Sequence, residues 1–370
     1  GKAWAARDVV MSGLKVGLKR SRNGPVTEVR EGPNLSKLPA LTCWPEDGGP
    51  FITLPLVLTA HPGGLGTNLG MYRMQIHDNK TTGMHWQIGK GGGFHYQIAE
   101  SRGQALPVTV FAGGPPALIL AAIAPLPENV PEMMLASLIA GRRLPQVPGP
   151  NGHPHPLVAA AEFAFMGEVP PAVRRPEGPF GDHYGYYSLR HDYPEFHVSQ
   201  IAHRHDAIYP ATVVGKPRQE DFYIGNLLQD LLSPLFPLVM PAVEQLWSYG
   251  ETGYHSLAAA VVKQRYPREA MASAFRILGE GQLSLTKFLL LTDRAVPLRD
   301  FRATLEHVLA RTDPRSDLYV FSNLSMDTLD YTGPAVNEGS KGVWLGLGDA
   351  VRDLPRVFAP LVAPPPEVAD

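Results

Sequence analysis

The sequence predicts an α+β protein in which a β-rich unit precedes a layered α/β domain. Short apolar runs with alternating polar residues dominate residues 42–220, and from residue 221 onward helix-like and strand-like runs alternate. The 37 glycines and 37 prolines are spread along the chain, which favours many turns and short strands. With 370 residues, 44% hydrophobic and 18% charged, the chain is long enough for two or three globular domains.

Composition also argues against nucleic-acid binding, membrane insertion and cross-linking by cysteine. The net charge of −2 argues against nucleic-acid binding, and no apolar run reaches the roughly 18 residues of a membrane span. Cys43 is the only cysteine, so an internal disulfide and a structural zinc site are excluded. No signal peptide is visible, and we expect a protein of the reducing cytoplasm.

Residues 1–40 predict a helix-containing lead-in followed by a proline-rich connection. Beyond it, residues 115–127 predict a short helix entered through proline, and residues 132–141 a helix that ends at Gly141. The other apolar stretches of the β-rich unit predict strands at 51–60, 71–78, 83–89, 106–114, 160–169, 186–191, 195–204 and 207–215. The alternating helices and strands of the second half cover residues 221–239, 256–266, 270–281, 287–293, 298–312 and 317–323.

The most informative segment runs from Glu177 to His183, and we call it the acid loop. It places Glu177 and Asp182 five residues apart, with two glycines and a proline between them. Proline lacks a backbone donor and glycine weakens regular structure, so this segment predicts a shaped loop that presents two acids. From the residues alone, exposed turn acids remain the alternative.

A second polar segment lies about a hundred residues upstream, where Arg73 follows Asn68 at the same spacing. Strand alternation puts Arg73 on one face with Met71 and Gln75. An inward-facing arginine needs an acid partner, because an unpaired buried charge is costly. Together the two segments offer a proton-transfer site, with an ordinary ion pair as the alternative.

These segments resemble the UbiD family of prenylated-FMN-dependent decarboxylases, the 3-octaprenyl-4-hydroxybenzoate carboxy-lyase type. The resemblance runs from about residue 41 to the end of the chain. It is carried by the two segments above and by four further motifs in the family's order: TCWPEDGGPFIT at 42–53, PLPENVPE at 125–132, DAIYPATVVGKP at 206–217 and EGSKGVWLG at 338–346.

The resemblance implies a fold and an organisation. Residues 41–220 would form a flavin-reductase-like split β-barrel that binds prenylated FMN, and residues 221–370 a C-terminal α/β domain. Residues 1–40 would be the remnant of an N-terminal α/β segment. We also expect a homo-oligomer, a dimer or a hexamer.

The implied activity is non-oxidative, reversible decarboxylation of an aromatic or α,β-unsaturated acid, with a role in quinone biosynthesis. Arg73 would orient the substrate carboxylate, and Glu177 would pair with Arg73 and stay ionised. Asp182 would donate the proton, because a carboxyl group in an apolar pocket has a raised pKa. The implied partners are a small aromatic acid and a flavin prenyltransferase that supplies the cofactor, with no nucleic acid and no membrane span.

The resemblance also implies a binding site for prenylated FMN or FMN with Mn²⁺ or Mg²⁺, and K⁺ as a further candidate ion. Asn68 and Glu132 would be metal ligands, since oxygen donors suit a hard cation. Gly89 stands where relatives carry a histidine ligand, and His85 lies too far along the strand to replace it. The implied cofactor-binding residues are Asn68, Met71, Tyr72, Arg73, Lys90, Pro125, Glu132 and Lys341.

Some of these assignments keep an alternative. Lys90 could neutralise the flavin phosphate in place of the missing histidine, and Lys341 could be an ordinary solvated lysine. His255 is a weaker candidate for a side chain that faces the substrate.

Two further functions remain open. One is a flavin-binding protein without decarboxylase activity. The other is a metal-dependent hydrolase built on the histidine pairs 153/155 and 203/205, of which the first is expected on the surface.

Overall fold

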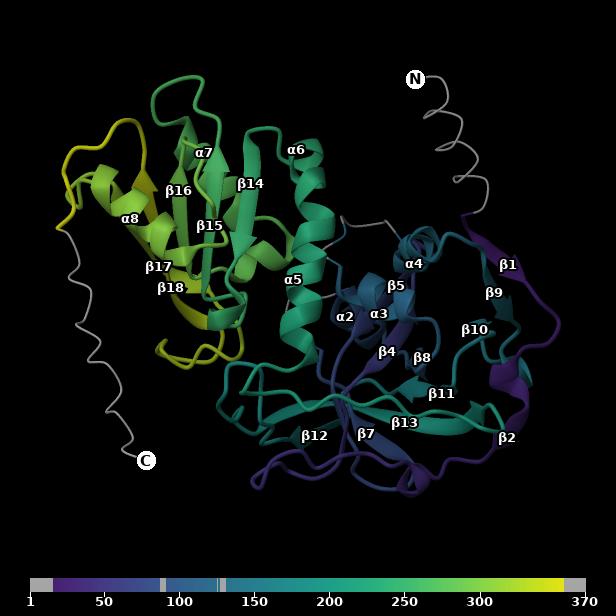
Figure 1. Ribbon diagram of the computed structural model, residues 1–370. Coiled ribbons are helices and arrows are strands. Elements are labelled where there is room, and N and C mark those ends of the chain that lie inside the picture. Colours follow the sequence, from purple (N-terminus) through teal and green to yellow (C-terminus); the bar gives the residue numbers. More distant parts are fainter. Residues whose placement is uncertain (1–15, 87–90, 125, 127–130, 356–370) are drawn as a thin grey trace, which may run out of the picture.

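The computed structural model describes residues 16–86, 91–124, 126 and 131–355. It contains two units, a β-rich one and an α/β one, with helix α5 (Glu220–Leu232) on the side of the α/β unit that faces its neighbour (Figure 1). The predicted α+β class is confirmed.

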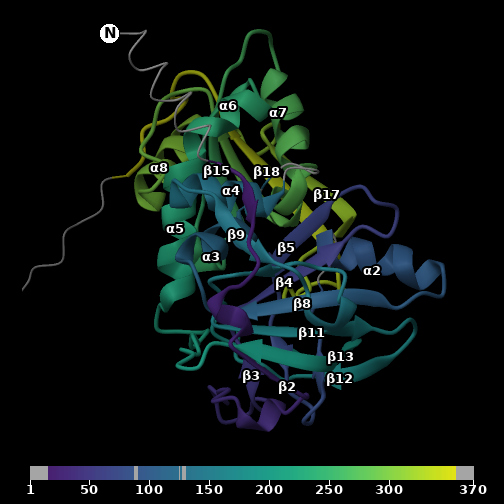
Figure 2. The same cartoon turned by 90° about the vertical axis from the view of Figure 1, so that its right-hand side faces the viewer.

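An antiparallel sheet of eight strands forms the centre of the first unit. Figure 2 shows its strands β13, β11, β8, β4 and β5 following one another in this order. The long strand β13 pairs with β12 and β7 through its first half, and with β11 and β2 through its second half. The strands are β2 (Val29–Glu31), β4 (Pro55–Ala60), β5 (Thr67–Met71), β7 (Thr81–Gly83), β8 (Leu106–Ala112), β11 (Phe163–Val169), β12 (Arg174–Glu177) and β13 (His191–His203).

Strand alternation divides the apolar side chains of this sheet between two cores. In β4, Leu56 packs in one core and Val57 in the other. Helices α3 (Pro116–Ile123) and α4 (Glu132–Ala140) cover the first core, and α2 (Gly91–Ser101) adds to the second. As predicted, α4 ends at Gly141, which has φ +62°, a left-handed conformation that favours glycine.

Two small sheets complete the first unit: β1 (Leu18–Arg20) with β9 (Leu144–Val147) and β10 (Leu157–Val158), and β3 (Phe51–Ile52) with β6 (Met74–Gln75). Strands β1 and β2 lie in the stretch expected as a lead-in, and they pair with β9 and β13. Short 3₁₀ helices occur at Pro25–Thr27, Leu35–Lys37, Pro150–Gly152, Ser233–Leu235, Gly250–Thr252 and Gly281–Leu285.

The second unit is a five-stranded mixed sheet in the order β14-β15-β16-β18-β17, with α7 packed against one face and α8 against the other. Strands β15, β16 and β18 are parallel. Parallel neighbours need long crossover connections, and α7 and α8 lie in these connections. Its remaining elements are α6 (Phe236–Val239), β14 (Val243–Ser248), β15 (Leu257–Val262), α7 (Glu269–Leu278), β16 (Phe288–Thr292), α8 (Phe301–Arg311), β17 (Leu318–Ser325) and β18 (Glu338–Gly346).

Several expectations about local structure are wrong. Of the strand predicted at 83–89, only Gly83 lies in a strand, β7; residues 84–86 form none, and residues 87–89 lie outside the described residues. The strand predicted at 71–78 is broken between β5 and β6, where Arg73 leaves the ladder for the acid loop. Residues 186–191 form no strand before β13, and residues 207–215, interrupted by Pro210, form none. Helix α2 was not predicted, because it begins with three glycines, which are poor helix formers.

Loop residues that follow the acid loop contact the second unit. The Tyr186 hydroxyl donates to the Leu329 carbonyl oxygen over 2.6 Å, and the Leu189 amide donates to the Tyr331 hydroxyl over 2.9 Å. The acid loop therefore lies at the seam between the two units. No helix among the described residues is long and apolar enough to cross a membrane.

Candidate active site

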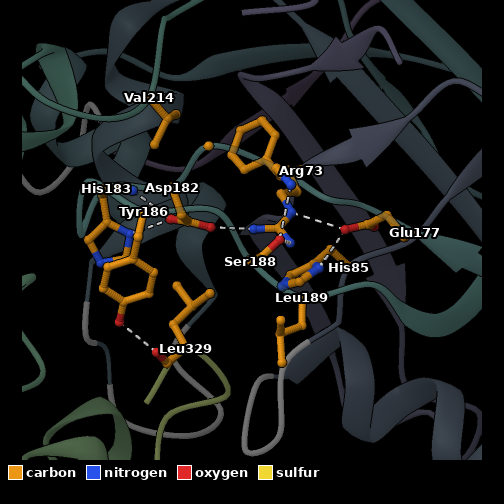
Figure 3. Close-up of polar contacts among 12 residues, drawn as sticks. Arg73, His85, Glu177, Asp182, His183, Tyr186, Ser188, Leu189, Val214 and Leu329 are labelled. Atoms are coloured by element: carbon orange, nitrogen blue, oxygen red, sulfur yellow. Dashed lines mark hydrogen bonds and ion pairs between the residues drawn. The ribbon is translucent and has the colours of Figure 1, made fainter. Parts of the chain in front are cut away.

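Arg73 lies at the centre of the candidate site and joins both acids of the acid loop. Its Nε donates to Glu177 Oε1 over 3.0 Å, its Nη1 to Asp182 Oδ2, and its Nη2 to Ser188 Oγ over 3.0 Å (Figure 3). The guanidinium also lies 4.6 Å above the centre of the Phe180 ring. The structure thus contains the expected Arg73–Glu177 pair.

The acid loop is held in shape by side chains from other segments. Gln75 accepts a hydrogen bond from the Gly178 amide over 2.8 Å, and Asp47 accepts one from the Gly181 amide over 2.8 Å. A Cβ at Gly181 would lie 2.1 Å from a ring carbon of Trp44, so only glycine fits there.

Glu177 is buried, and its Oε1 atom lies between Arg73 and His85. His85 Nδ1 lies 2.9 Å from the same Oε1 atom that Arg73 contacts, and the His85 ring packs 4.3 Å from the Tyr193 ring. Burial alone would raise the pKa of Glu177, but His85 and Arg73 together lower it. From the sequence, His85 was expected neither to pair with Glu177 nor to replace the family's histidine ligand. The sequence does place His85 between two apolar residues, Met84 and Trp86, both of which are buried, and this was the one sign that His85 is buried too.

Asp182 does not have the environment expected of a free acid. Burial raises its pKa, as expected, but hydrogen bonds from His183 and the charges of Arg73 and His183 outweigh burial and lower the pKa overall. The expectation of a raised pKa is therefore wrong. The sequence did not reveal that Arg73 would reach both acids at once.

The opposite end of β5 brings together the residues expected to hold a cofactor. A Cβ at Gly91, the first residue of α2, would lie 2.2 Å from Asn68 Oδ1. The Tyr72 hydroxyl accepts a hydrogen bond from the backbone amide of Gly92 over 3.3 Å and another from the side-chain Nδ2 of Asn68 over 3.4 Å. Glu132 Oε2 accepts from the Leu69 amide over 3.0 Å, and burial raises the pKa of Glu132.

The other expected cofactor residues are placed differently. Met71 ends β5 and packs against the core that α3 and α4 cover. Lys341 lies in β18, where its ammonium donates to the carbonyl oxygens of Ser284 and Thr286 over 2.7 and 2.8 Å, and burial lowers its pKa to about 8. Lys90, Pro125 and Gly89 lie outside the described residues.

The histidine pairs do not build a metal centre. His153 and His155 both contact the Thr109 hydroxyl, and His155 is 5% exposed, so the expected surface position is wrong for that residue. His203 Nδ1 lies 2.6 Å from the Arg204 carbonyl oxygen. The described residues contain no group of three or more histidine, cysteine or acidic side chains that could hold a metal ion.

Family models match most of the chain. Residues 18–217 match the 3-octaprenyl-4-hydroxybenzoate carboxy-lyase Rift-related domain, and residues 222–346 match the C-terminal domain of the same family. The chain belongs to the UbiD family.

Curated relatives agree with this assignment. The chain is 58% identical over 357 residues to a Chlamydia pneumoniae protein described as a 4-hydroxybenzoate decarboxylase component, with 96% of this chain and 61% of that one covered. It is 40% identical over 324 residues to an uncharacterized Archaeoglobus fulgidus protein, covering 87% and 67%. The chain thus spans about three-fifths of the length of the chlamydial relative.

Two solved structures share the fold at low sequence identity. The closed form of vanillic acid decarboxylase from Sedimentibacter hydroxybenzoicus superposes with a TM-score of 0.84 at 23% identity, covering 95% of this chain and 76% of that one. The UbiD-class enzyme HmfF from Pelotomaculum thermopropionicum, in an evolved dimeric form with prFMN, gives 0.75 at 22% identity, covering 94% and 77%.

Proposed function

We propose that the protein is a carboxy-lyase that uses prenylated FMN to decarboxylate an aromatic acid reversibly. The observation that carries the proposal is the buried cluster in which Arg73 contacts both Glu177 and Asp182. The family supports the reaction class, and the name of the chlamydial relative makes a hydroxybenzoate the first substrate to test. A role in quinone biosynthesis is part of the proposal.

The residues at the start of α2 fit a flavin phosphate and a divalent cation. The amides at a helix N-terminus attract phosphate, and Gly91, which has no side chain, lets this end of α2 approach Asn68 closely. Asn68 and Glu132 offer amide and carboxylate oxygens, which suit Mg²⁺ or Mn²⁺. Since two protein ligands are few, phosphate and water would complete the coordination.

Each residue of the cluster has a task that follows from its contacts. A guanidinium carries five N–H donors, so Arg73 retains donors for a substrate carboxylate beyond the three nitrogen contacts above. Glu177, held by Arg73 and His85, fixes the guanidinium in place. Asp182 is the acid through which a proton reaches the carbon that loses carbon dioxide. Prenylated FMN, when bound, supplies the electron sink for that carbon.

The supply of the cofactor and the assembly of the protein are further parts of the proposal. A flavin prenyltransferase would provide the prenylated flavin, and the active protein would be a homo-oligomer. The alternative, a flavin-binding protein without decarboxylase activity, has the absence of histidine at Gly89 in its favour.

The proposal is tested on protein purified from cells that also express a flavin prenyltransferase. The mass spectrum of the released cofactor should show prenylated FMN, and the protein should release carbon dioxide from at least one hydroxybenzoate. A bound flavin without carbon dioxide release from a broad panel of aromatic acids would favour the binding protein. Protein without flavin would contradict both.

A further inference from the structure

His183 lies between the acid loop and the second unit, and both of its ring nitrogens face oxygen acceptors. Nδ1 lies 2.6 Å from Asp182 Oδ1, and Nε2 lies 3.2 Å from the Gly253 carbonyl oxygen (Figure 3 shows the Asp182 contact). A neutral imidazole has one N–H and can donate to only one of these oxygens, whereas an imidazolium donates to both. The geometry therefore favours the doubly protonated ring.

Carboxylates surround this ring. Asp182 lies on its own loop, Asp221 lies in the first turn of α5, and Asp327 lies between β17 and β18. Asp221 Oδ1 is buried and has no hydrogen-bond partner among the described residues. Burial alone would lower the pKa of His183, but the bond and charge of Asp182, the charge of Asp327 and the backbone carbonyl raise it overall.

Two other basic side chains near this ring are themselves paired with acids. The His255 ring lies 6.4 Å from the His183 ring and is itself paired with Asp327. Arg218 is paired with Glu251 at 2.9 Å. The remaining neighbours on the loop are aromatic: Tyr184 packs 4.6 Å from the His183 ring.

A cavity of about 300 Å³ adjoins His183 at the seam between the units. It could hold several water molecules, since each occupies about 30 Å³ in the liquid. Lys216, Arg218 and Glu251 in its lining are exposed, so it reaches the surface. The lining residues that matter here are His183, Lys216, Arg218, Asp221, Glu251 and Tyr254.

We propose that His183 stores the proton that Asp182 delivers to the substrate, and that water in this cavity replaces it. The idea rests on the proposed decarboxylase function. The Nδ1–H bond of the imidazolium breaks and an O–H bond forms on Asp182. The carboxyl group then gives this proton to the electron pair left on carbon when carbon dioxide departs. The neutral ring then takes up one proton from bulk solvent, relayed by water in the cavity, and becomes an imidazolium again, so one solvent proton is consumed in each turnover.

This arrangement resolves a difficulty in the site. Asp182 is held ionised by Arg73 and His183, so the isolated carboxyl group has no proton to give near neutral pH. A short hydrogen bond to an imidazolium supplies one without requiring a raised pKa. His183 acts through Asp182 and is therefore a positioning and proton-storing residue.

The first test measures the protonation of His183 in the cofactor-free protein by ¹⁵N NMR of histidine-labelled chain, assigned with a His183→Gln variant. We expect the signals of a doubly protonated ring at pH 7, titrating above the ordinary histidine value of about 6.5. A neutral ring at pH 7 would overturn the proposal. This measurement needs no turnover, so it stands apart from the proposed function.

The second test uses the loaded enzyme. His183→Ala should lower kcat at least about a hundredfold with little change in KM, the scale of a lost proton-transfer group. Imidazole that enters the enlarged cavity should restore activity, with rescue that follows the pKa of substituted imidazoles. His205→Gln, an exposed histidine elsewhere in the first unit, is the matched control and should behave as the wild type.

The outcomes of the two tests separate the claims. Wild-type kcat and pH profile in the His183→Ala variant would overturn the role of His183. A folded variant whose lost activity no imidazole restores would also count against proton storage. Failure of the wild type itself to release carbon dioxide would contradict the proposed function and leave the NMR result standing.

Discussion

Arg73 is the residue on which the proposed chemistry of the site depends. It contacts two carboxylates and a hydroxyl through three different nitrogens, an arrangement that requires a planar, branched cation. The pKa of Glu177 is lowered by His85 and Arg73, and that of Asp182 by His183 and Arg73, so both carboxylates are ionised at neutral pH. Loss of either acid would leave Arg73 partly unpaired in a buried place.

The first prediction concerns the shape of this cation. Arg73→Lys keeps the charge but cannot reach Glu177, Asp182 and Ser188 at once. We expect kcat for decarboxylation to fall about 10²-fold or more, the scale of a lost preorganised donor, while flavin absorbance is retained. Normal turnover in this variant, measured as carbon dioxide release, would show that Arg73 is only structural.

At the scale of single residues, only part of the site could be predicted from the sequence. The acid loop could be predicted, because its glycines and proline exclude regular structure, and the Arg73–Glu177 pair followed from the resemblance to the UbiD family. The contact between Arg73 and Asp182 and the place of His85 could not, since both depend on where β5 breaks and how the loop folds back. The partners of Lys341 were hidden because two backbone carbonyls, which carry no sequence signal, accept its protons.

At the scale of elements, the start of α2 is where the proposal places the phosphate of the cofactor. Three consecutive glycines weaken the helix, yet Tyr96 and Ala99 pack it on the sheet. Glycine at position 91 lets the helix end approach Asn68. The sequence could not show this approach, because it joins segments on either side of a hairpin, and low helix propensity concealed the helix itself.

The second prediction tests this approach. Gly91→Ala should displace the Asn68 side chain, because the new Cβ would lie 2.2 Å from its Oδ1. Alanine favours a helix by up to about 1 kcal/mol over glycine, so Tm should change little. Flavin retention, measured by absorbance after gel filtration, should fall about tenfold or more. Ser101→Ala at the other end of α2 is the control, and equal flavin retention in both variants would contradict the assignment.

The third prediction concerns position 89, where the resemblance implies a histidine ligand and this chain has glycine. If Asn68 and Glu132 are the only protein ligands, purified protein should hold little divalent metal. Gly89→His should raise both metal content and flavin retention, on the roughly 10–100-fold scale of ligand-shell changes. Elemental analysis of both proteins decides the matter. Stoichiometric metal in the unmutated chain, with no gain in the variant, would show that the ligand is misassigned.

At the scale of the whole molecule, the site lies where two independently layered units meet. The acid loop belongs to the first unit, whereas Gly253 and Asp327 come from the second. Tyr184 bridges them by donating to Asp327 over 3.3 Å. The α+β class and the order of the units followed from apolar periodicity, but the seam did not, because single hydrogen bonds between distant loops leave no periodic pattern.

The fourth prediction uses the acid dependence of this seam. Burial raises the pKa of Asp327, but its bond to His255 and nearby charges lower it to about 2. Because the pKa is lowered in the folded state, ionised Asp327 stabilises the fold at pH values above the ordinary aspartate pKa of about 3.9. This stabilisation is lost as the pH falls toward 2. Asp327→Asn should therefore lower the free energy of unfolding at pH 6. The difference in this free energy between the variant and the wild type should shrink as the pH falls from about 4 toward 2. A gap in urea melts that does not depend on pH would contradict the pairing.

The most direct test of the account is release of ¹³CO₂ from carboxyl-labelled hydroxybenzoates by the protein loaded with prenylated FMN. The account predicts release by the wild type and at least about a hundredfold slower release by Asp182→Asn, which keeps the size of the side chain but cannot deliver a proton. Equal flavin content in the two proteins is the control. Equal rates of release would contradict the claim that Asp182 carries the proton, and no release by a fully loaded wild type from any acid tested would contradict the decarboxylase itself.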